Sequence, residues 1–372
     1  MTILFISSCR SDLSILQHPI KFFQKYSHLK SFIYIGGYNF DNKSSGNNKL
    51  NIKGLKNIIF SKNSEIKNFD YTDTNVANFI TNEVKNIIKK KNIKYIFILG
   101  DRFEIASLAI NLVNNLVILF HLHGGEITKG SNDNIYRYVI SKCSDYHFVS
   151  TIKSKERLIK QQFKSNSIYN IGSLALDSLS KIKKFKDIKI INKKFNINLE
   201  FKNYIVVSLH PETVSNINYI QQINILFKSI QGIKSNFIFT SPSPDNGREF
   251  FIKKIKFECK KNPNYYYIEN LGYEFFYDLL MSTNLFIGNS SAGIIESIYF
   301  NIPFINIGSR QLGREYSKNI INVKWNINSI KSYIHKCLLS NSHNFKLSDS
   351  FYYKKNSVNI LLQKFNQIIS QQ

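Results

Sequence analysis

Short apolar runs alternate with longer amphipathic stretches along this chain, and this alternation constrains the fold more than any other feature. In the first half, the predicted buried strands cover residues 3–7, 31–35, 95–99, 116–120, 146–149 and 167–171. Helical stretches such as 73–91 and 103–114 lie between them. Strands and helices that alternate in this way form a parallel sheet with helices on both faces.

The same rhythm starts again in the second half. Its predicted strands cover residues 204–209, 237–240, 265–268, 285–288 and 304–307, with helices at 217–230 and 247–260. The polar, lysine-rich residues 181–202 separate the two sets, so we place a domain junction there. The sequence predicts an α/β protein with two Rossmann-like domains, at 1–180 and 181–355, followed by a C-terminal helix at 356–372. The polar segment 40–50 is the most disorder-prone part of the chain.

Composition narrows the class of protein. The chain has 372 residues, 43% of them hydrophobic, which is enough for two cores. Its net charge of +25 comes from lysines spread along the whole chain, so we expect no nucleic-acid partner, although the charge would attract an anionic substrate. The four scattered cysteines have no metal-ligand spacing, and the apolar start predicts a buried strand rather than a signal peptide. No apolar run is long enough for a membrane span, and we expect a cytoplasmic protein.

Unusual polar segments follow several of the predicted strands. Ligands of open parallel sheets bind beyond the carboxyl ends of the strands, and two such sheets that face each other form a cleft. The segment GDRFE at 100–104 follows the strand predicted at 95–99, where Gly100 permits a tight turn. Asp101 then lies either at the mouth of the cleft or at the N-cap of the next helix, and the spacing leaves both alternatives open.

The segment FHLHGGE at 120–126 follows the next predicted strand. His121, His123 and Glu126 are possible metal ligands, but no third His or Cys lies nearby, so an acid–base pocket is favoured over a metal site. Asp133 lies seven residues beyond Glu126 and is expected in the same cavity. Together with Asp101, these side chains form a set of carboxylates that exchange protons when their pKa values are separated.

In the second half, GNSSAGIIE at 288–296 follows the strand predicted at 285–288. Backbone N–H groups at a helix start favour a phosphate, and Ser290 and Ser291 would add hydroxyl donors. The alternative is an ordinary serine N-cap. Glu296 is placed to accept a hydrogen bond from a ribose hydroxyl. The segment is not a Walker loop, because no Gly-Lys-Ser/Thr follows.

Basic side chains follow other predicted strands. His210 ends the first strand of the second half and is expected either to bind a phosphate or to be structural. Arg310 and Arg314 lie in a glycine-containing turn, which suits phosphate binding. Arg10 offers a further cation from the N-terminal half.

Taken together, these motifs resemble the UDP-N-acetylglucosamine 2-epimerase family, especially its hydrolysing, sialic-acid-pathway branch. The matches run in order along nearly the whole chain: CRSD at 9–12, GDRFE at 100–104, HLHGGEIT at 121–128, Asp133 with Arg137, IGS at 171–173, HPET at 210–213, GNSSAGIIE at 288–296 and INIGSRQLGR at 305–314. The resemblance implies a glycosyltransferase-B-like fold in which the C-terminal domain holds most of the UDP.

The resemblance also implies roles for individual residues. The catalytic carboxylates would be Asp101, Glu126 and Asp133. The UDP and its diphosphate would contact a larger set: Arg10, His210, Ser290, Ser291, Glu296, Arg310 and Arg314. Other substrate contacts would come from Arg102, His123 and Arg137. The family implies no metal or redox cofactor, and a homodimer or homotetramer.

The implied reaction converts UDP-N-acetylglucosamine and water to free N-acetylmannosamine and UDP, by elimination to a glycal and hydration. Alternatives are the same reaction on UDP-N,N'-diacetylbacillosamine, a 4-acetamido-6-deoxy sugar, and the non-hydrolysing epimerase. A glycosyltransferase or a non-enzymatic binding protein would leave the three carboxylates unexplained. The chain departs from the family at residues 35–38, which read IGGY, and at Tyr138, where the family usually has histidine.

Overall fold

The chain folds into two compact units. The computed structural model describes residues 1–40, 50, 52–66, 72–182, 185–243, 245–340 and 343–371, so most of the segment predicted to be disorder-prone lies outside the described residues. Unit 1 comprises residues 1–126, 133–180 and 352–372, and unit 2 comprises 127–132 and 181–351. No helix in the described part of the chain is long and apolar enough to cross a bilayer.

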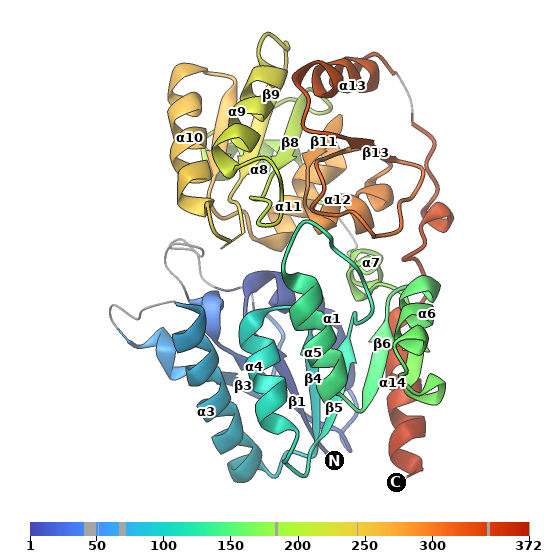
Figure 1. The fold of residues 1–372 in the computed structure, drawn as a ribbon. Helices are drawn as coiled ribbons and strands as arrows, with labels where there is room; N and C mark the ends of the chain where they lie inside the picture. Colours follow the sequence, from blue (N-terminus) through green and yellow to red (C-terminus); the bar gives the residue numbers. More distant parts are fainter. Residues whose placement is uncertain are drawn as a thin grey trace. The chain divides into compact units, whose positions relative to one another are not determined.

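Unit 1 is built on a parallel sheet of seven strands, in the order β3-β2-β1-β4-β5-β6-β7 (Figure 1). The strands are β1 (Thr2–Ser7), β2 (Lys30–Ile35), β3 (Ile58–Phe60), β4 (Tyr95–Leu99), β5 (Ile118–Leu122), β6 (Tyr146–Val149) and β7 (Ile168–Asn170). The central strands are apolar and buried on both faces, as expected for a parallel sheet covered by helices. Side chains alternate between the faces along each strand, so each face has its own core.

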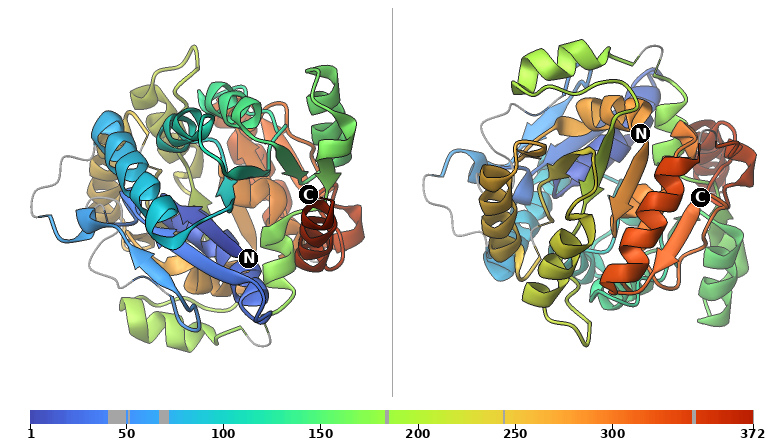
Figure 2. Two further views of the ribbon diagram at one scale, coloured as in Figure 1. Left: turned by 90° about the horizontal axis from the view of Figure 1, so that it is seen from below. Right: turned by 90° about the horizontal axis from the view of Figure 1, so that it is seen from above.

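Helices cover both faces of this sheet (Figure 2). On one face, Ile3 and Phe5 of β1 pack with residues of α1 (Arg10–Phe23), α7 (Leu174–Leu179) and α14 (Ser357–Ser370). On the other face, Leu4 and Ile6 pack with α3 (Asp73–Lys91), α4 (Phe103–Leu112) and α5 (Asp133–Cys143). A small cluster joins β6 and β7 to α6 (Ile152–Lys160).

The C-terminal helix α14 belongs to unit 1, although it follows unit 2 in the sequence. The ring of Phe365 lies 5.3–5.7 Å from the rings of four aromatic residues, and aromatic contacts of this kind strengthen apolar burial. Those four residues are Phe23, Tyr95, Phe97 and Phe120. The apolar side of α14 therefore completes one core of the N-terminal sheet.

Unit 2 repeats the plan with six parallel strands in the order β10-β9-β8-β11-β12-β13. The strands are β8 (Tyr204–Ser208), β9 (Asn236–Thr240), β10 (Tyr265–Ile268), β11 (Leu285–Gly288), β12 (Phe304–Ile307) and β13 (Ile320–Val323). Its helices are α8 (Ile188–Phe195), α9 (Tyr219–Ile230), α10 (Arg248–Lys261), α11 (Gly272–Ser282), α12 (Ser291–Ile295) and α13 (Ile327–Leu339). The predicted α/β class with two Rossmann-like sheets is confirmed.

The predicted strand at 116–120 was wrong by two residues. The observed strand β5 runs from Ile118 to Leu122, and Leu116 is fully exposed before it. An apolar residue in a turn had extended the apparent run at its start. The shift matters for the site, because it places His121 inside the sheet rather than beyond its end.

Candidate active site

The carboxyl ends of β4 and β5 bring the first candidate residues together. Gly100 follows β4 with a φ of +95°, a conformation that favours glycine, and it turns the chain into the loop that carries Asp101. The N-cap of α4 is Arg102, and the Arg102 side chain makes no capping hydrogen bond. The N-cap alternative for Asp101 is therefore wrong, and its partly exposed carboxylate instead meets Arg137.

Arg137 of α5 links two of the candidate carboxylate positions. Its side chain is only 3% exposed, and its Nη2 forms an ion pair with the Asp101 carboxylate. Its Nη1 donates to the backbone oxygen of Glu126 at 2.8 Å and to Asn134 Oδ1 at 3.0 Å. A guanidinium has several donors in a fixed plane, so one buried arginine can hold both the loop after β4 and the loop after β5.

Glu126 is buried at the end of the loop that follows β5. Its Oε1 accepts a hydrogen bond from Ser150 Oγ, at the end of β6. The Gly-Gly pair before it brings the backbone close to α6: a Cβ on Gly125 would lie 2.4 Å from the backbone oxygen of Ser154. These glycines therefore allow close packing within unit 1.

His121 has a structural place in the sheet. Its ring is fully buried, with Nδ1 2.9 Å from Ser141 Oγ and Nε2 2.9 Å from the backbone oxygen of Gly100. Burial lowers its pKa to about 4, so the ring is neutral near pH 7. With both nitrogens bonded to protein atoms, His121 is not placed to ligate a metal. No group of three His, Cys, Asp or Glu among the described residues could hold a metal ion.

Asp133 is the first residue of α5, and Arg137 lies one turn further along the same helix. Residues four apart share one side of a helix, so Asp133 projects from the side that carries Arg137.

His123, in the loop before Glu126, has a left-handed φ of +63°. Arg10 begins α1, and burial lowers its pKa to about 10, which leaves it charged at neutral pH.

In unit 2, His210 and the loop after β11 hold each other. The His210 backbone N–H donates to Asn289 Oδ1 at 2.7 Å, and Asn289 Nδ2 donates to the His210 oxygen at 2.8 Å. The ring Nδ1 accepts from the Ser243 N–H at 2.9 Å. In the neutral ring the proton must then be on Nε2, which makes Nε2 a donor suited to an anionic oxygen.

The segment after β11 is shaped by close packing. A Cβ on Gly288, whose φ is +141°, would lie 1.9 Å from the backbone oxygen of Ser208 in β8. Ser290 caps α12 by accepting from the Ala292 N–H at 3.3 Å, and Ser291 is exposed at its first turn. Because α12 spans only five residues, its dipole is small, and individual N–H and hydroxyl donors are the groups it offers a phosphate.

Glu296 lies buried at the end of α12. Burial raises the pKa of this carboxyl to about 7, while a hydrogen bond from the Tyr277 hydroxyl lowers it. A carboxyl with this pKa is about half ionised near neutral pH. Only the ionised form of Glu296 accepts hydrogen bonds with both of its oxygens. Glu296 can therefore accept from two ribose hydroxyls only in the upper part of the physiological pH range.

Arg310 and Arg314 lie in the loop after β12, and a buried carboxylate shapes that loop. Arg310 Nη1 donates to the Pro211 oxygen at 3.1 Å, and its Nη2 lies 2.9 Å from Asp245. Glu212 accepts from the Arg310 N–H at 2.8 Å and from Trp325 Nε1 at 3.1 Å. Sequence reasoning gave Glu212 no role, because its partners lie about 100 residues away.

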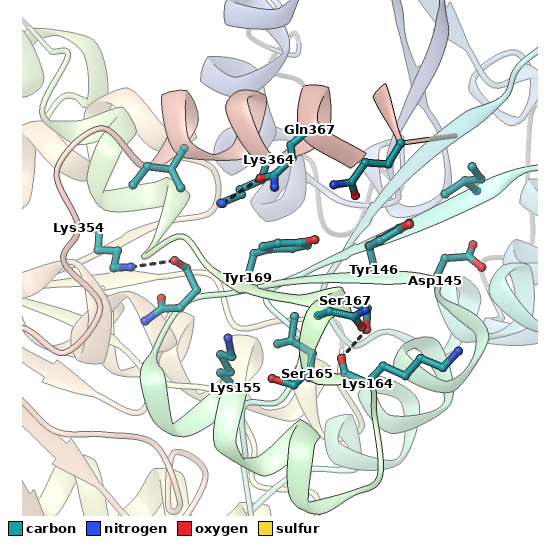
Figure 3. A pocket seen from close by; sticks show the side chains of 16 residues that line it. Asp145, Tyr146, Lys155, Lys164, Ser165, Ser167, Tyr169, Lys354, Lys364 and Gln367 are labelled. Atoms are coloured by element: carbon teal, nitrogen blue, oxygen red, sulfur yellow. Dashed lines mark hydrogen bonds between the residues drawn. The ribbon is translucent and has the colours of Figure 1, made fainter. Parts of the chain in front are cut away.

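A pocket of about 940 Å³ in unit 1 contains none of the candidate residues. It runs beside the edge strand β7, and residues that begin β5, β6 and β7 line it, at the opposite end of the sheet from Asp101. Figure 3 shows Tyr146 and Tyr169 within it, and Lys354, which donates to the Asn170 oxygen at 2.8 Å. Lysines beside an edge strand hinder its pairing with another strand.

Comparison with known proteins identifies one family for most of the chain. The family model described as UDP-N-acetylglucosamine 2-epimerase matches residues 62–365. Polysialic acid biosynthesis protein P7 of Escherichia coli is 29% identical over 337 residues, 88% of this chain and 84% of that protein. The hydrolysing GDP/UDP-N,N'-diacetylbacillosamine 2-epimerase of Campylobacter jejuni is 36% identical over 233 residues, 62% of this chain and 60% of that protein.

A solved structure supports the same fold. The Neisseria meningitidis UDP-GlcNAc 2-epimerase, bound to UDP-GlcNAc, superposes with a TM-score of 0.81 over 99% of this chain and 100% of that one, at 14% identity. The predicted glycosyltransferase-B-like fold is confirmed. The relative from Campylobacter jejuni, which is named as a hydrolysing enzyme, supports the hydrolysing branch. Since the family model covers most of the chain, the chain belongs to the UDP-N-acetylglucosamine 2-epimerase family.

Proposed function

We propose that this protein is a hydrolysing 2-epimerase, which converts UDP-N-acetylglucosamine and water to N-acetylmannosamine and UDP. The observation that carries the proposal is the assembly of Asp101, Arg137 and Glu126 at the carboxyl ends of β4 and β5. Carboxylates at that position would provide the acid and base that epimerisation requires.

The reaction balances in two steps. A carboxylate takes the proton from C2 of the sugar, the C2–H electron pair forms a C1–C2 double bond, and UDP leaves with the electrons of the C1–O bond. Water then adds across the double bond, with its hydroxyl on C1 and a proton delivered to C2 from the opposite face. The three candidates for these transfers are Asp101, Glu126 and Asp133, and two faces of the sugar require at least two of them.

The departing diphosphate requires positive charge and hydrogen-bond donors. We assign this role to Arg10, to His210 through its Nε2 proton, and to Ser290 and Ser291. Arg310 and Arg314 add positive charge in the loop after β12, although Arg310 already bonds to Pro211 and Asp245. Glu296 would accept from the ribose hydroxyls, and Arg102 and His123 would contact the sugar.

A second candidate substrate is UDP-N,N'-diacetylbacillosamine. The Campylobacter relative, named for this sugar, shares 36% of residues in the matched segment, against 29% for the Escherichia coli relative over a longer one. The chemistry at C1 and C2 would be the same for both sugars. Only side chains near C4 and C6 would distinguish them.

Proton NMR of the purified protein with UDP-N-acetylglucosamine in heavy water tests the proposal. The expected result is free N-acetylmannosamine with deuterium at C2 and an equal amount of UDP. An interconverting mixture of intact UDP-sugars would show a non-hydrolysing epimerase instead. If the substrate stays unchanged, the same measurement with the diacetylated 6-deoxy sugar decides between the two substrates, and failure with both would refute the proposal.

Affinity for UDP is expected to fall about tenfold between pH 8 and pH 6, because the Glu296 carboxyl, with a pKa of about 7, must be ionised to accept from the ribose. Calorimetric titration across this range measures the effect. A phosphate group of the ligand also titrates near pH 6, so Glu296→Gln is the control. The variant should bind more weakly at pH 8 and keep only the smaller pH dependence of the ligand; equal pH dependence in both proteins would contradict the assignment.

A further inference from the structure

The residues that separate two of the candidate carboxylates belong to unit 2. Unit 1 ends at Glu126 and starts again at Asp133, and the segment Ile127–Asn132 between them is part of unit 2. We call this segment the strap. The proposed reaction gives the strap no role, although half of its residues are buried. The buried residues are Thr128, Gly130 and Ser131.

Backbone hydrogen bonds hold the strap to two loops of unit 2. The Lys129 N–H donates to the Leu312 oxygen at 2.9 Å, in the loop after β12. The Gly130 oxygen accepts from the Val214 N–H at 3.3 Å, directly after the HPET segment at 210–213. The strap therefore bridges two of the loops to which we assign contacts with the diphosphate.

Gly130 lies directly against the backbone of the loop after β12. A Cβ on Gly130 would lie 2.5 Å from the Cα of Arg310, 2.6 Å from its N and 2.8 Å from the carbonyl carbon of Ser309. These atoms are backbone, so they cannot swing away as the end of a side chain can. From the other side, a Cβ on Gly313 would lie 2.5 Å from Ile127 Cγ2. The absence of a side chain at both glycines therefore allows the strap and the loop to pack together.

The part of the loop that Gly130 touches is bonded to Glu212. This buried carboxylate accepts from the Arg310 N–H at 2.8 Å and from Ser309 Oγ at 3.1 Å. It also accepts from Trp325 Nε1 at 3.1 Å. A side chain at position 130 that displaced the loop would therefore disturb the bonds of Glu212 and the surroundings of the Trp325 indole. Trp325 is the single tryptophan of the chain, so its fluorescence reports on the docking of the strap.

The two ends of the strap continue directly into candidate carboxylates of unit 1. Glu126 precedes the strap, and its backbone oxygen accepts from Arg137 Nη1 at 2.8 Å. Asp133 follows the strap as the first residue of α5, the helix that also carries Arg137. Arg137 in turn pairs with Asp101. Because a short segment has little slack, the backbone positions of Glu126 and Asp133 depend on where the strap docks.

We propose that the strap couples binding of the diphosphate to the placement of Glu126 and Asp133, and that Gly130 is a positioning residue for the proposed reaction. The docked strap fixes the backbone of Arg310, and a diphosphate held by that loop fixes the strap in return. Such coupling is reciprocal: if docking favours the nucleotide, the nucleotide favours docking by the same factor. The identity of the ligand rests on the proposed function, whereas the docking of the strap does not.

Hydrogen exchange of the wild-type protein, followed by mass spectrometry with and without UDP, tests the coupling. UDP should slow exchange of the strap about fivefold or more, together with exchange of the segments 288–296 and 305–314 that contain its assigned contacts. Slower exchange at 288–296 and 305–314 with an unchanged strap would overturn the coupling and leave the nucleotide site intact. No change in any of the three segments would refute the nucleotide site of the proposed function, and the coupling with it.

Gly130→Ala tests the positioning residue. Its Cβ should displace the loop after β12, so the emission of Trp325 should shift in the protein without any ligand. UDP affinity and kcat should each fall about tenfold, because the loop and the two carboxylates lose their fixed backbone together. A residue that served only to hold UDP would raise KM and leave kcat unchanged.

The matched control is Lys129→Ala, which removes an exposed side chain from the strap and keeps the backbone bond to Leu312. It should leave both the emission of Trp325 and kcat unchanged. Unchanged emission in Gly130→Ala, or a raised KM with wild-type kcat, would overturn the positioning role. If Gly130→Ala does not fold, hydrogen exchange of the wild-type protein still decides the coupling. If no protein turns over either sugar, the proposed function fails, while the emission of Trp325 still decides the docking.

Discussion

Changing Glu126 to glutamine is expected to lower kcat by a factor of about 10² to 10⁴, the usual contribution of a general acid or base. Glutamine keeps the size of the side chain and can still accept from Ser150, whose hydroxyl bonds Glu126 in the buried loop after β5. The variant should therefore fold normally and bind UDP with unchanged affinity. Steady-state release of UDP and of the free sugar measures the loss.

The matched control is Glu156→Gln, on the exposed side of α6 in the same unit, which should leave kcat unchanged. Asp133→Asn should give a loss comparable to that of Glu126→Gln, since one carboxylate removes the C2 proton and another supplies a proton on the opposite face. If both variants kept wild-type turnover, the carboxylate mechanism would be wrong. A variant that still releases UDP but accumulates the glycal would assign the second step to the carboxylate that it lacks.

Alternation of apolar and amphipathic stretches predicted the fold well, because parallel strands that are buried on both faces must be apolar throughout. The bounds of β10 (Tyr265–Ile268), β11 (Leu285–Gly288) and β12 (Phe304–Ile307) agree with the predictions. The edge strands β3 and β13 were missed. Both are short and only partly buried, so their apolar signal is weak.

The sequence predicted which side chains collect at the carboxyl ends of β4 and β5, but not how they bond to one another. Polar residues after parallel strands lie at one sheet edge, and this pattern selected Asp101 and Glu126 as candidates. Nothing local indicates that Arg137 bonds to Asp101, 36 residues earlier in the chain. The same holds for Glu212, whose partner Trp325 lies 113 residues away. Such pairs depend on the packing of whole elements, which a residue pattern does not encode.

His121 shows how a small error in a strand boundary alters a functional interpretation. With the strand ending at Phe120, two histidines and a glutamate seemed to share one loop, so a metal site was worth considering. With β5 ending at Leu122, the His121 ring turns into the sheet and bonds to Ser141 and Gly100. A shift of two residues separated a structural histidine from the loop that carries Glu126.

Asp101→Asn is expected to lower the free energy of unfolding of unit 1 by about 3 kcal/mol, in addition to its effect on turnover. The substitution removes the negative charge that pairs with the buried Arg137 guanidinium, and breaking a buried pair in this way is strongly destabilising. Arg137→Met should cost less, about 2 kcal/mol, because the Asp101 carboxylate that remains is 28% exposed and can be hydrated.

The double variant separates charge pairing from ordinary packing loss. If Asp101→Asn costs more than Arg137→Met because of the buried charge, the double variant should lose about 1–3 kcal/mol less than the sum of the two single losses. Denaturant unfolding followed by circular dichroism measures these values, and the fluorescence of Trp325, the single tryptophan of the chain, follows unit 2 as an internal control. Additive losses, or a larger loss for Arg137→Met alone, would show that the pair does not organise the site through its charge.

Arg137 would then act through its bonds to Glu126 and Asn134. In that case Arg137→Lys, which keeps the charge but loses the planar guanidinium, should be as destabilising as Arg137→Met.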